Sequence, residues 1–107
     1  MMANFEVYTD KAGQTRFRLK AGNGEIILKS EGYTTRRSAL NGVASVKKNA
    51  LVAMRFERKE TKAGSSFNLK ATNGQVVGTS EVYNSAQARD KGIASVQANA
   101  PKAEVKG

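Results

Sequence analysis

The sequence of 107 residues contains no cysteine, no histidine and no tryptophan, and it has a single proline. Without cysteine the chain cannot form disulfides, which favours a cytoplasmic location. Without cysteine and histidine it also lacks the usual zinc ligands and the usual catalytic nucleophile–base pair. A metal site would need clustered carboxylates, but the nine Asp and Glu residues are scattered. We therefore expect no metal, no cofactor and no enzymatic activity.

Long apolar segments are also missing. No run approaches the roughly 18 apolar residues that indicate a membrane span. The first residues, Met1 to Phe5, show no basic-then-apolar secretion signal. We expect no membrane association.

Basic residues, in contrast, are abundant. Lys and Arg number 18 against nine Asp and Glu, for a net charge of +9. Such an excess favours a polyanionic partner, either nucleic acid or an acidic protein. A basic but merely solvated surface explains the charge equally well.

The most informative feature is an internal duplication. Residues 17–24 match residues 67–74, and Gly-Val-Ala-Ser-Val at 42–46 returns as Gly-Ile-Ala-Ser-Val at 92–96. This copy predicts two equivalent structural units. Each is too small to bury a core alone, so we expect one domain over residues 1–107. Its repeats are residues 4–50 and 55–100, and the small, polar tail of residues 101–107 is expected to be disordered.

Within each repeat the hydrophobic period changes once. Three segments show patterns typical of β-strands. Apolar and polar residues alternate in residues 5–9 and 16–20, and residues 25–29 contain a short apolar run. Asn23-Gly24 is typical of a type I′ hairpin turn, which would place Leu19 opposite Leu28 and Ala21 opposite Ile26. From Thr34 the period is helical, with Thr34 and Asn84 as expected N-caps. The helices are expected to end in left-handed residues at Asn49 and Asn99.

These patterns predict an α+β fold of two tandem βββα repeats related by a pseudo-twofold axis. The antiparallel meanders should carry both helices on one sheet face. The buried residues are then expected to be Phe17, Leu19, Val43 and Val46 with Phe67, Leu69, Ile93 and Val96.

Six residue pairs that are identical between the repeats are candidates for structural or functional roles. Glycine within a helix is unfavourable, so its retention indicates either close packing or a helix that opens toward a ligand. The Ser-Glu-x-Tyr corner is either a pocket, with the two glutamates meeting across the axis, or a tie between strand and helix. The helix serines are expected to bond a carbonyl one turn back. We favour the structural interpretation for Ser30, Glu31, Tyr33, Gly42, Ser45 and Asn49, and for Ser80, Glu81, Tyr83, Gly92, Ser95 and Asn99.

A row of cations is the candidate nucleic-acid-binding surface. Arg16, Arg18 and Lys20 alternate along one strand, about 6.6–6.8 Å apart, close to the spacing of backbone phosphates. The second repeat has Ser66 and Asn68 at the arginine positions, so the surface is either one-sided or only solvated. The complete candidate set is Arg16, Arg18, Lys20, Lys29, Arg36 and Arg37.

The duplicated motifs Phe-x-Leu-Lys-Ala-x-Asn-Gly, Ser-Glu-x-Tyr and Gly-[Val/Ile]-Ala-Ser-Val-x-x-Asn closely resemble the YegP-like family of small bacterial proteins, over residues from about 4 to 100. The resemblance implies a tandem βββα architecture, with single-repeat relatives pairing as dimers. The family's function is uncharacterised, so the resemblance assigns no catalytic residue. One departure is Leu28, which becomes Gly78 in the second repeat and makes the two sheet faces unequal.

The sequence therefore predicts a non-catalytic binding module that is monomeric, with nucleic acid as the leading partner class. The alternative is a protein-interaction or assembly module that uses an exposed strand edge. Salt separates the two, since phosphate-driven binding weakens steeply with salt and strand addition does not.

Overall fold

The computed structural model describes residues 3–107, so Met1 and Met2 of the expected N-terminal segment lie outside the described residues. The first repeat comprises β1 (Asn4–Thr9), β2 (Thr15–Lys20), β3 (Ile26–Lys29) and α1 (Arg36–Asn49). The second comprises β4 (Phe56–Thr61), β5 (Gly64–Lys70), β6 (Val76–Thr79) and α2 (Ala86–Asn99). Short 3₁₀ turns η1 (Ala53–Arg55) and η2 (Ala100–Lys102) follow the helices, and strand β7 (Glu104–Lys106) ends the chain.

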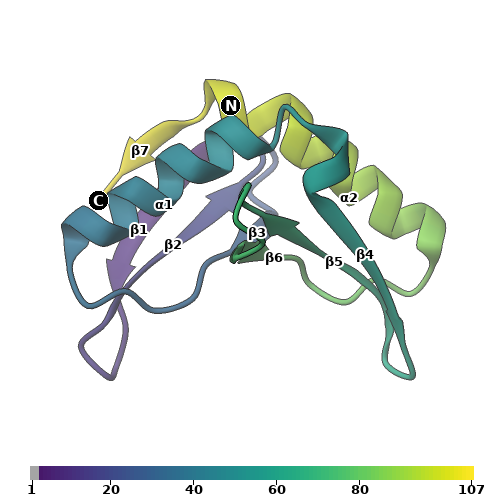
Figure 1. Cartoon of the computed structure of the whole chain (residues 1–107), viewed down its shortest axis with the longest axis horizontal. Coiled ribbons are helices and arrows are strands. Elements are labelled where there is room, and N and C mark those ends of the chain that lie inside the picture. Colours follow the sequence, from purple (N-terminus) through teal and green to yellow (C-terminus); the bar gives the residue numbers. More distant parts are fainter. Residues whose placement is uncertain (1–2) are drawn as a thin grey trace.

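The strands form one seven-stranded sheet in the order β4-β5-β6-β3-β2-β1-β7. The two meanders join where β3 and β6 pair antiparallel through Lys29 and Thr79, which occupy the same position in their repeats. A residue paired with its own counterpart places the pseudo-twofold axis at this point. The two hairpins reach outward at opposite ends, and the helices cover the same side (Figure 1). The predicted fold class is confirmed.

In the β2–β3 hairpin the predicted pair Leu19–Leu28 is confirmed, but the predicted pair Ala21–Ile26 and the predicted turn type were wrong. Leu19 faces Leu28, whereas Ile26 pairs with Lys20 because the register shifts between Leu19 and Lys20. Gly24 has φ +88° and donates its N–H to the Ala21 carbonyl at 2.9 Å. Among residues 3–107 no non-glycine residue has positive φ, which excludes a type I′ turn at Asn23. The turn is instead a three-residue loop that ends in a left-handed glycine with a bulge.

The helix ends also differ from expectation. The N-caps are Thr35 and Ser85, each one residue later than predicted, and their side chains accept from the N–H of Ser38 and Ala88. The predicted left-handed ends at Asn49 and Asn99 were wrong, because both residues are helical. Their side chains have local partners inside the helix, described below.

All eight predicted core residues are buried. Equivalent edge-to-face pairs anchor the two halves: Phe5 with Phe17 at 5.9 Å between ring centroids, and Phe56 with Phe67 at 5.7 Å. Each helix packs on its own repeat and also on the third strand of the other, α1 on β6 and α2 on β3. The repeats therefore share one core.

The prediction of a disordered tail was wrong. Strand β7 pairs in parallel with β1, where Val105 lies opposite Phe5 and Lys106 opposite Glu6. Ala103, just before this strand, is buried. The tail is ordered because β1 would otherwise be a sheet edge with unpaired backbone groups, and the alternating Ala103 and Val105 suit that edge.

Over the described residues 3–107, neither helix combines the length and the apolar character needed to cross a membrane.

Candidate ligand-binding hollows between the repeats

The serine of each Ser-Glu-x-Tyr corner ties strand to strand. The Ser30 hydroxyl accepts from the Phe17 N–H at 2.9 Å and donates to the Glu31 carbonyl at 2.8 Å. Ser80 repeats both bonds with Phe67 and Glu81, at 2.9 and 2.7 Å. These hydroxyls have structural partners on both sides, so they are not presented to a ligand.

The tyrosine of each corner packs against a helix glycine. A Cβ on Gly42 would collide with the Tyr33 ring and hydroxyl, and Gly92 stands in the same relation to Tyr83. Burial raises the pKa of both tyrosines. The close approach expected at these glycines is therefore present, made by a phenol from the corner of the same repeat.

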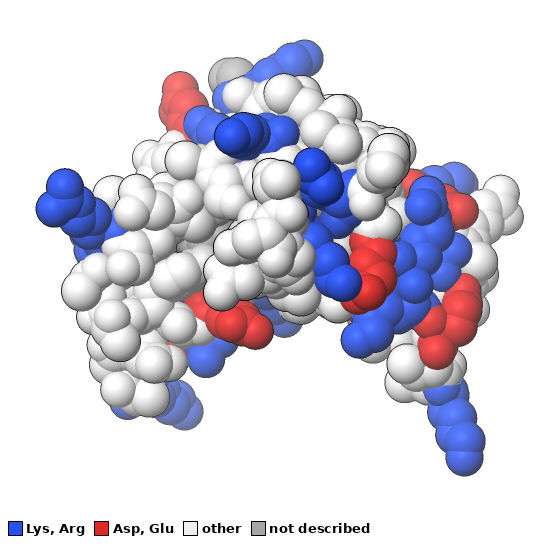
Figure 2. Space-filling model, in the orientation of Figure 1, with Lys and Arg blue, Asp and Glu red and all other residues white. Residues whose placement is uncertain are grey.

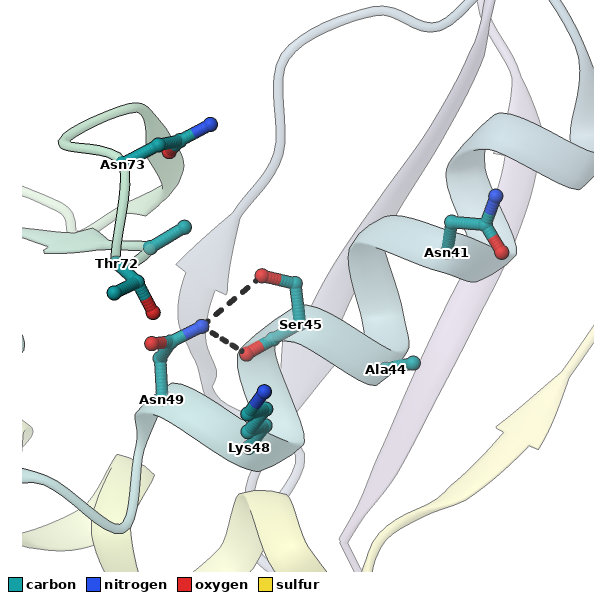
Figure 3. Close-up of a pocket in the computed structure, with 8 residues that line it drawn as sticks. Asn41, Ala44, Ser45, Lys48, Asn49, Thr72 and Asn73 are labelled. Carbon is teal, nitrogen blue, oxygen red and sulfur yellow. Dashed lines mark hydrogen bonds between the residues drawn. The ribbon is translucent and has the colours of Figure 1, made fainter.

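Ser45 and Asn49 are linked one helical turn apart. The Asn49 Nδ2 donates to the Ser45 carbonyl at 2.8 Å and to its hydroxyl at 3.1 Å (Figure 3). Asn99 makes the same two bonds to Ser95. The serine hydroxyl thus accepts from the following turn, instead of the expected bond to a carbonyl one turn back.

Beside this pair, α1 borders a hollow whose other wall is the β5–β6 turn of the second repeat. We call it the α1 hollow; its volume is about 440 Å³. Figure 3 shows Thr72 and Asn73 facing the helix across it. Its lining contains one cation and no carboxylate: Asn41, Ala44, Ser45, Lys48, Asn49, Ala71, Thr72 and Asn73.

The pseudo-twofold axis produces a second hollow, the α2 hollow, between α2 and the β2–β3 turn. It is smaller, about 230 Å³. Its Asn23 and Ser95 are equivalent to Asn73 and Ser45 of the α1 hollow. At the position equivalent to Asn41 it has Lys91. Glu25 also lines it, however, and offsets the lysine. Of the two hollows, only the α1 hollow offers an acid-free surface to an anion.

The two corner glutamates lie in different surroundings. Glu31 lines a hollow of about 390 Å³ with Tyr33 and the start of β6, whereas the Glu81 carboxylate lies 3.9 Å from Lys29 Nζ. Within residues 3–107, no three His, Cys, Asp or Glu side chains come together in a group that could hold a metal ion.

The row of cations on β2 is largely neutralised by neighbouring carboxylates. Arg16 Nε lies 2.6 Å from Asp10 Oδ2, and Glu6 binds both Arg18 and Lys20, the latter at 3.2 Å. These hydrogen bonds hold the carboxyl pKa of Asp10 and Glu6 below the usual values. With Lys29 paired to Glu81, the four sheet cations face three carboxylates.

Arg36 and Arg37 are separated from that row, because they begin α1 in the helical layer. In residues 3–107 they have no carboxylate within 4 Å, and the same holds for Lys47 and Lys48. All 18 Lys and Arg lie within residues 3–107, where seven of them pair with six carboxylates, so eleven cations and three Asp or Glu carboxylates have no ion-pair partner in that range. In Figure 2 red and blue alternate at the right, over β4 and α2, while blue atoms project alone from both hairpin ends.

Sequence reasoning did not single out the residues of the α1 hollow other than Ser45 and Asn49. Nothing in the local pattern brings α1 beside a turn some twenty-five residues later. The duplication does indicate such a contact, because two units that share one core must place the helix of one unit against strands of the other.

Comparisons with known proteins agree with this architecture. A family model described as a domain of unknown function (DUF1508) matches residues 10–57 and again residues 62–106. A UPF0339 protein from the ptx operon 5′ region of Stutzerimonas stutzeri is 59% identical over 63 residues, which are 59% of this chain and 57% of that protein. A UPF0339 protein of Agrobacterium fabrum is 55% identical over 49 residues, 46% of this chain and 79% of that protein, so it has room for one repeat only.

Two solved structures are similar over nearly the whole chain. The solution structure of yegP from Escherichia coli, a protein of unknown function, has a TM-score of 0.93 and 48% identity, and 99% of this chain and 92% of that chain align. The solution structure of a UPF0339 protein of Shewanella oneidensis has a TM-score of 0.92 and 43% sequence identity, and the alignment covers 99% of this chain and 91% of that chain. With a family model matching both repeats and these structures matching the complete fold, the chain belongs to the DUF1508 domain family, among the relatives of YegP.

Proposed function

We propose that the protein is a non-catalytic module that binds the phosphate backbone of single-stranded nucleic acid along α1. The observation that carries the proposal is the contrast in charge between two surfaces. The β2 row is paired with carboxylates, while the four α1 cations have no such partner in residues 3–107, and one of them, Lys48, lines the acid-free α1 hollow.

The cations lie at useful positions on the helix. Arg37 and Lys48 are eleven residues apart, so they lie on nearly the same face, about 16 Å apart along the axis. Asn41 and Ala44 lie between them on that face and line the hollow. The small Ala44 leaves the backbone accessible, and the exposed Asn41 supplies an amide donor. This surface can contact successive phosphates without reading bases, so binding is expected to be largely independent of sequence.

The test is a fluorescence-anisotropy titration with short single-stranded DNA and RNA at low and physiological salt. The variant Arg37→Ala/Lys48→Ala removes two unpaired cations. The matched control, Arg16→Ser/Arg18→Asn, removes two cations from the β2 row and copies the second repeat.

The α1 variant should bind about tenfold more weakly at low salt, with the slope of log affinity against log salt reduced by about 1.4 for the two lost contacts. The control should retain most of the affinity. Absence of binding by the parent at low salt, or a larger loss in the control, would contradict the proposal.

A further inference from the structure

The α2 hollow contains an acid and a base that do not neutralise each other. Glu25 and Lys91 both line it, yet in residues 3–107 neither forms an ion pair within 4 Å, with the other or with any third side chain. The equivalent residues of the other repeat are Gln75 and Asn41, which are both neutral. The two sites therefore differ by one acid and one base, which come together at the α2 hollow.

Two further polar side chains of the α2 hollow have a donor available for a ligand. The Asn23 Oδ1 accepts from the Glu25 N–H at 3.0 Å, so the amide group of Asn23 can still donate through Nδ2. The Ser95 hydroxyl accepts from the Asn99 Nδ2 at 3.1 Å, so its own proton can still be donated. Together with Lys91, these groups suit a ligand oxygen that carries negative charge.

The phenol of Tyr83 lies at the wall of the hollow beside Gly92. A Cβ on Gly92 would lie 2.5 Å from the Tyr83 hydroxyl oxygen, and both residues line the hollow. Burial raises the pKa of Tyr83, and the nearby carboxylates of Glu81 and Glu25 raise it further. The phenol is therefore protonated at neutral pH and can donate a hydrogen bond.

The rest of the wall is apolar and the space is small. Ala21, Ile27 and Ala88 complete the lining of the hollow. Its volume of about 230 Å³ lies below the roughly 300–1,000 Å³ of most ligand pockets, which limits the ligand to a few heavy atoms. Several donors, one carboxylate and an apolar wall together match a carboxylate, an ammonium group and an aliphatic side chain.

We propose that the α2 hollow binds a free α-amino acid with a small aliphatic side chain. Lys91, Ser95 and Tyr83 hold the carboxylate of the ligand, and Glu25 holds its ammonium group. Each charge of the ligand thus meets an opposite charge that has no ion-pair partner within residues 3–107. This site is formed by α2 and the β2–β3 turn, so it is separate from the α1 cations and goes beyond the proposed nucleic-acid function.

The test is an NMR titration of the full-length, isotope-labelled protein with L-valine. Amide shifts are expected at residues 23–25 and 91–95, and not at residues 73–75 and 41–45, their equivalents in the other repeat. Two analogues each lack one charge of valine: isovalerate has no ammonium group, and isobutylamine has no carboxylate. Each should bind about tenfold more weakly than valine, because one set of charge-assisted hydrogen bonds is lost.

A double variant tests the two charged side chains directly. Glu25→Gln/Lys91→Asn gives the α2 hollow the neutral residues of the other repeat, and it should bind valine about tenfold more weakly. Both positions are exposed, so the fold should be retained. The control, Lys62→Asn/Glu104→Gln, makes the same change at exposed positions outside the hollow and should bind valine as the parent does. Both variants keep the α1 cations, so their nucleic-acid binding should equal that of the parent.

Three results would overturn the proposal. One is the absence of shifts around the α2 hollow at tens of millimolar valine. Another is equal binding of valine and isovalerate by the parent protein, which does not depend on any variant. The third is a double variant that binds valine as tightly as the parent or as tightly as the control. None of these results depends on nucleic acid, so failure here is distinguishable from failure of the α1 proposal.

Discussion

At the scale of single residues, the departures from the repeat are as informative as the identities. Leu28 becomes Gly78 in the second repeat, and a Cβ on Gly78 would lie 2.6 Å from Leu28 Cδ2. The two positions face each other near the pseudo-twofold axis, where one large side chain fills the space of both. Two leucines would collide and two glycines would leave a cavity, so the asymmetry is a packing requirement.

The contact between Tyr33 and Gly42 leads to a prediction. Gly42→Leu should lower the free energy of unfolding by about 1–3 kcal/mol, because the new side chain displaces the Tyr33 and Phe17 rings from a filled core. The control is Ala44→Leu, at an exposed position of the same helix, which should stay within about 0.5 kcal/mol. Urea unfolding followed by circular dichroism measures both, and equal stability of the two variants would show that the glycine is not needed for packing.

At the scale of elements, β7 decides which sheet edge is open. The strand contains a single apolar residue, Val105, which lies opposite Phe5 of β1. Ala103, just before the strand, is buried. At the corresponding edge of the second repeat, no strand pairs with β4 in residues 3–107, and Arg58 and Arg89 form ion pairs with Asp90 instead. One edge is therefore closed by backbone pairing and the other is guarded by side chains.

Deleting residues 103–107 should lower the free energy of unfolding by about 1–3 kcal/mol, since β1 loses its parallel partner and the buried Ala103. The exposed edge should also promote self-association, which sedimentation at increasing concentration measures. Lys106→Ser is the control, because that exposed side chain lies outside the core and its loss should change neither property. A truncated chain as stable and monomeric as the parent would mean that β7 contributes nothing to the sheet.

At the scale of the whole molecule, the two repeats are interdependent. The helix of each packs on the third strand of the other, and within residues 3–107 the two meanders pair only through Lys29 and Thr79. In a relative with room for a single repeat the other half of this core would be missing, and a second copy would supply it with the same geometry.

A chain of residues 1–50 is therefore expected to be unfolded as a monomer or to form a dimer that imitates the full chain. The reason is that α1 loses its contacts with β6 and β5, and a fifty-residue unit buries too little surface alone. Circular dichroism combined with sedimentation at micromolar concentration gives the answer. A folded monomer would show that the repeats do not depend on a common core.

The sequence by itself determined the six strands of the two meanders, both helices, the duplication and the buried face. These follow from local periodicity, and the eight predicted core residues lie where alternation and helical spacing placed them. Two of its errors were local: cap positions shifted by one residue, and a turn whose Asn-Gly pair suits more than one geometry. Another, the tail expected to be disordered, was not local, because β7 is ordered by its pairing with β1 at the other end of the chain.

Only the tertiary structure decided which charges are neutralised and which surfaces meet. Asp10 and Glu6 reach the β2 cations across a hairpin, which left the predicted row paired and the α1 cations unpaired. The α1 hollow joins Lys48 to Asn73, and β7 joins the end of the chain to its beginning. Such contacts depend on how distant segments fold back on each other, and periodicity over a few residues carries no information about that arrangement.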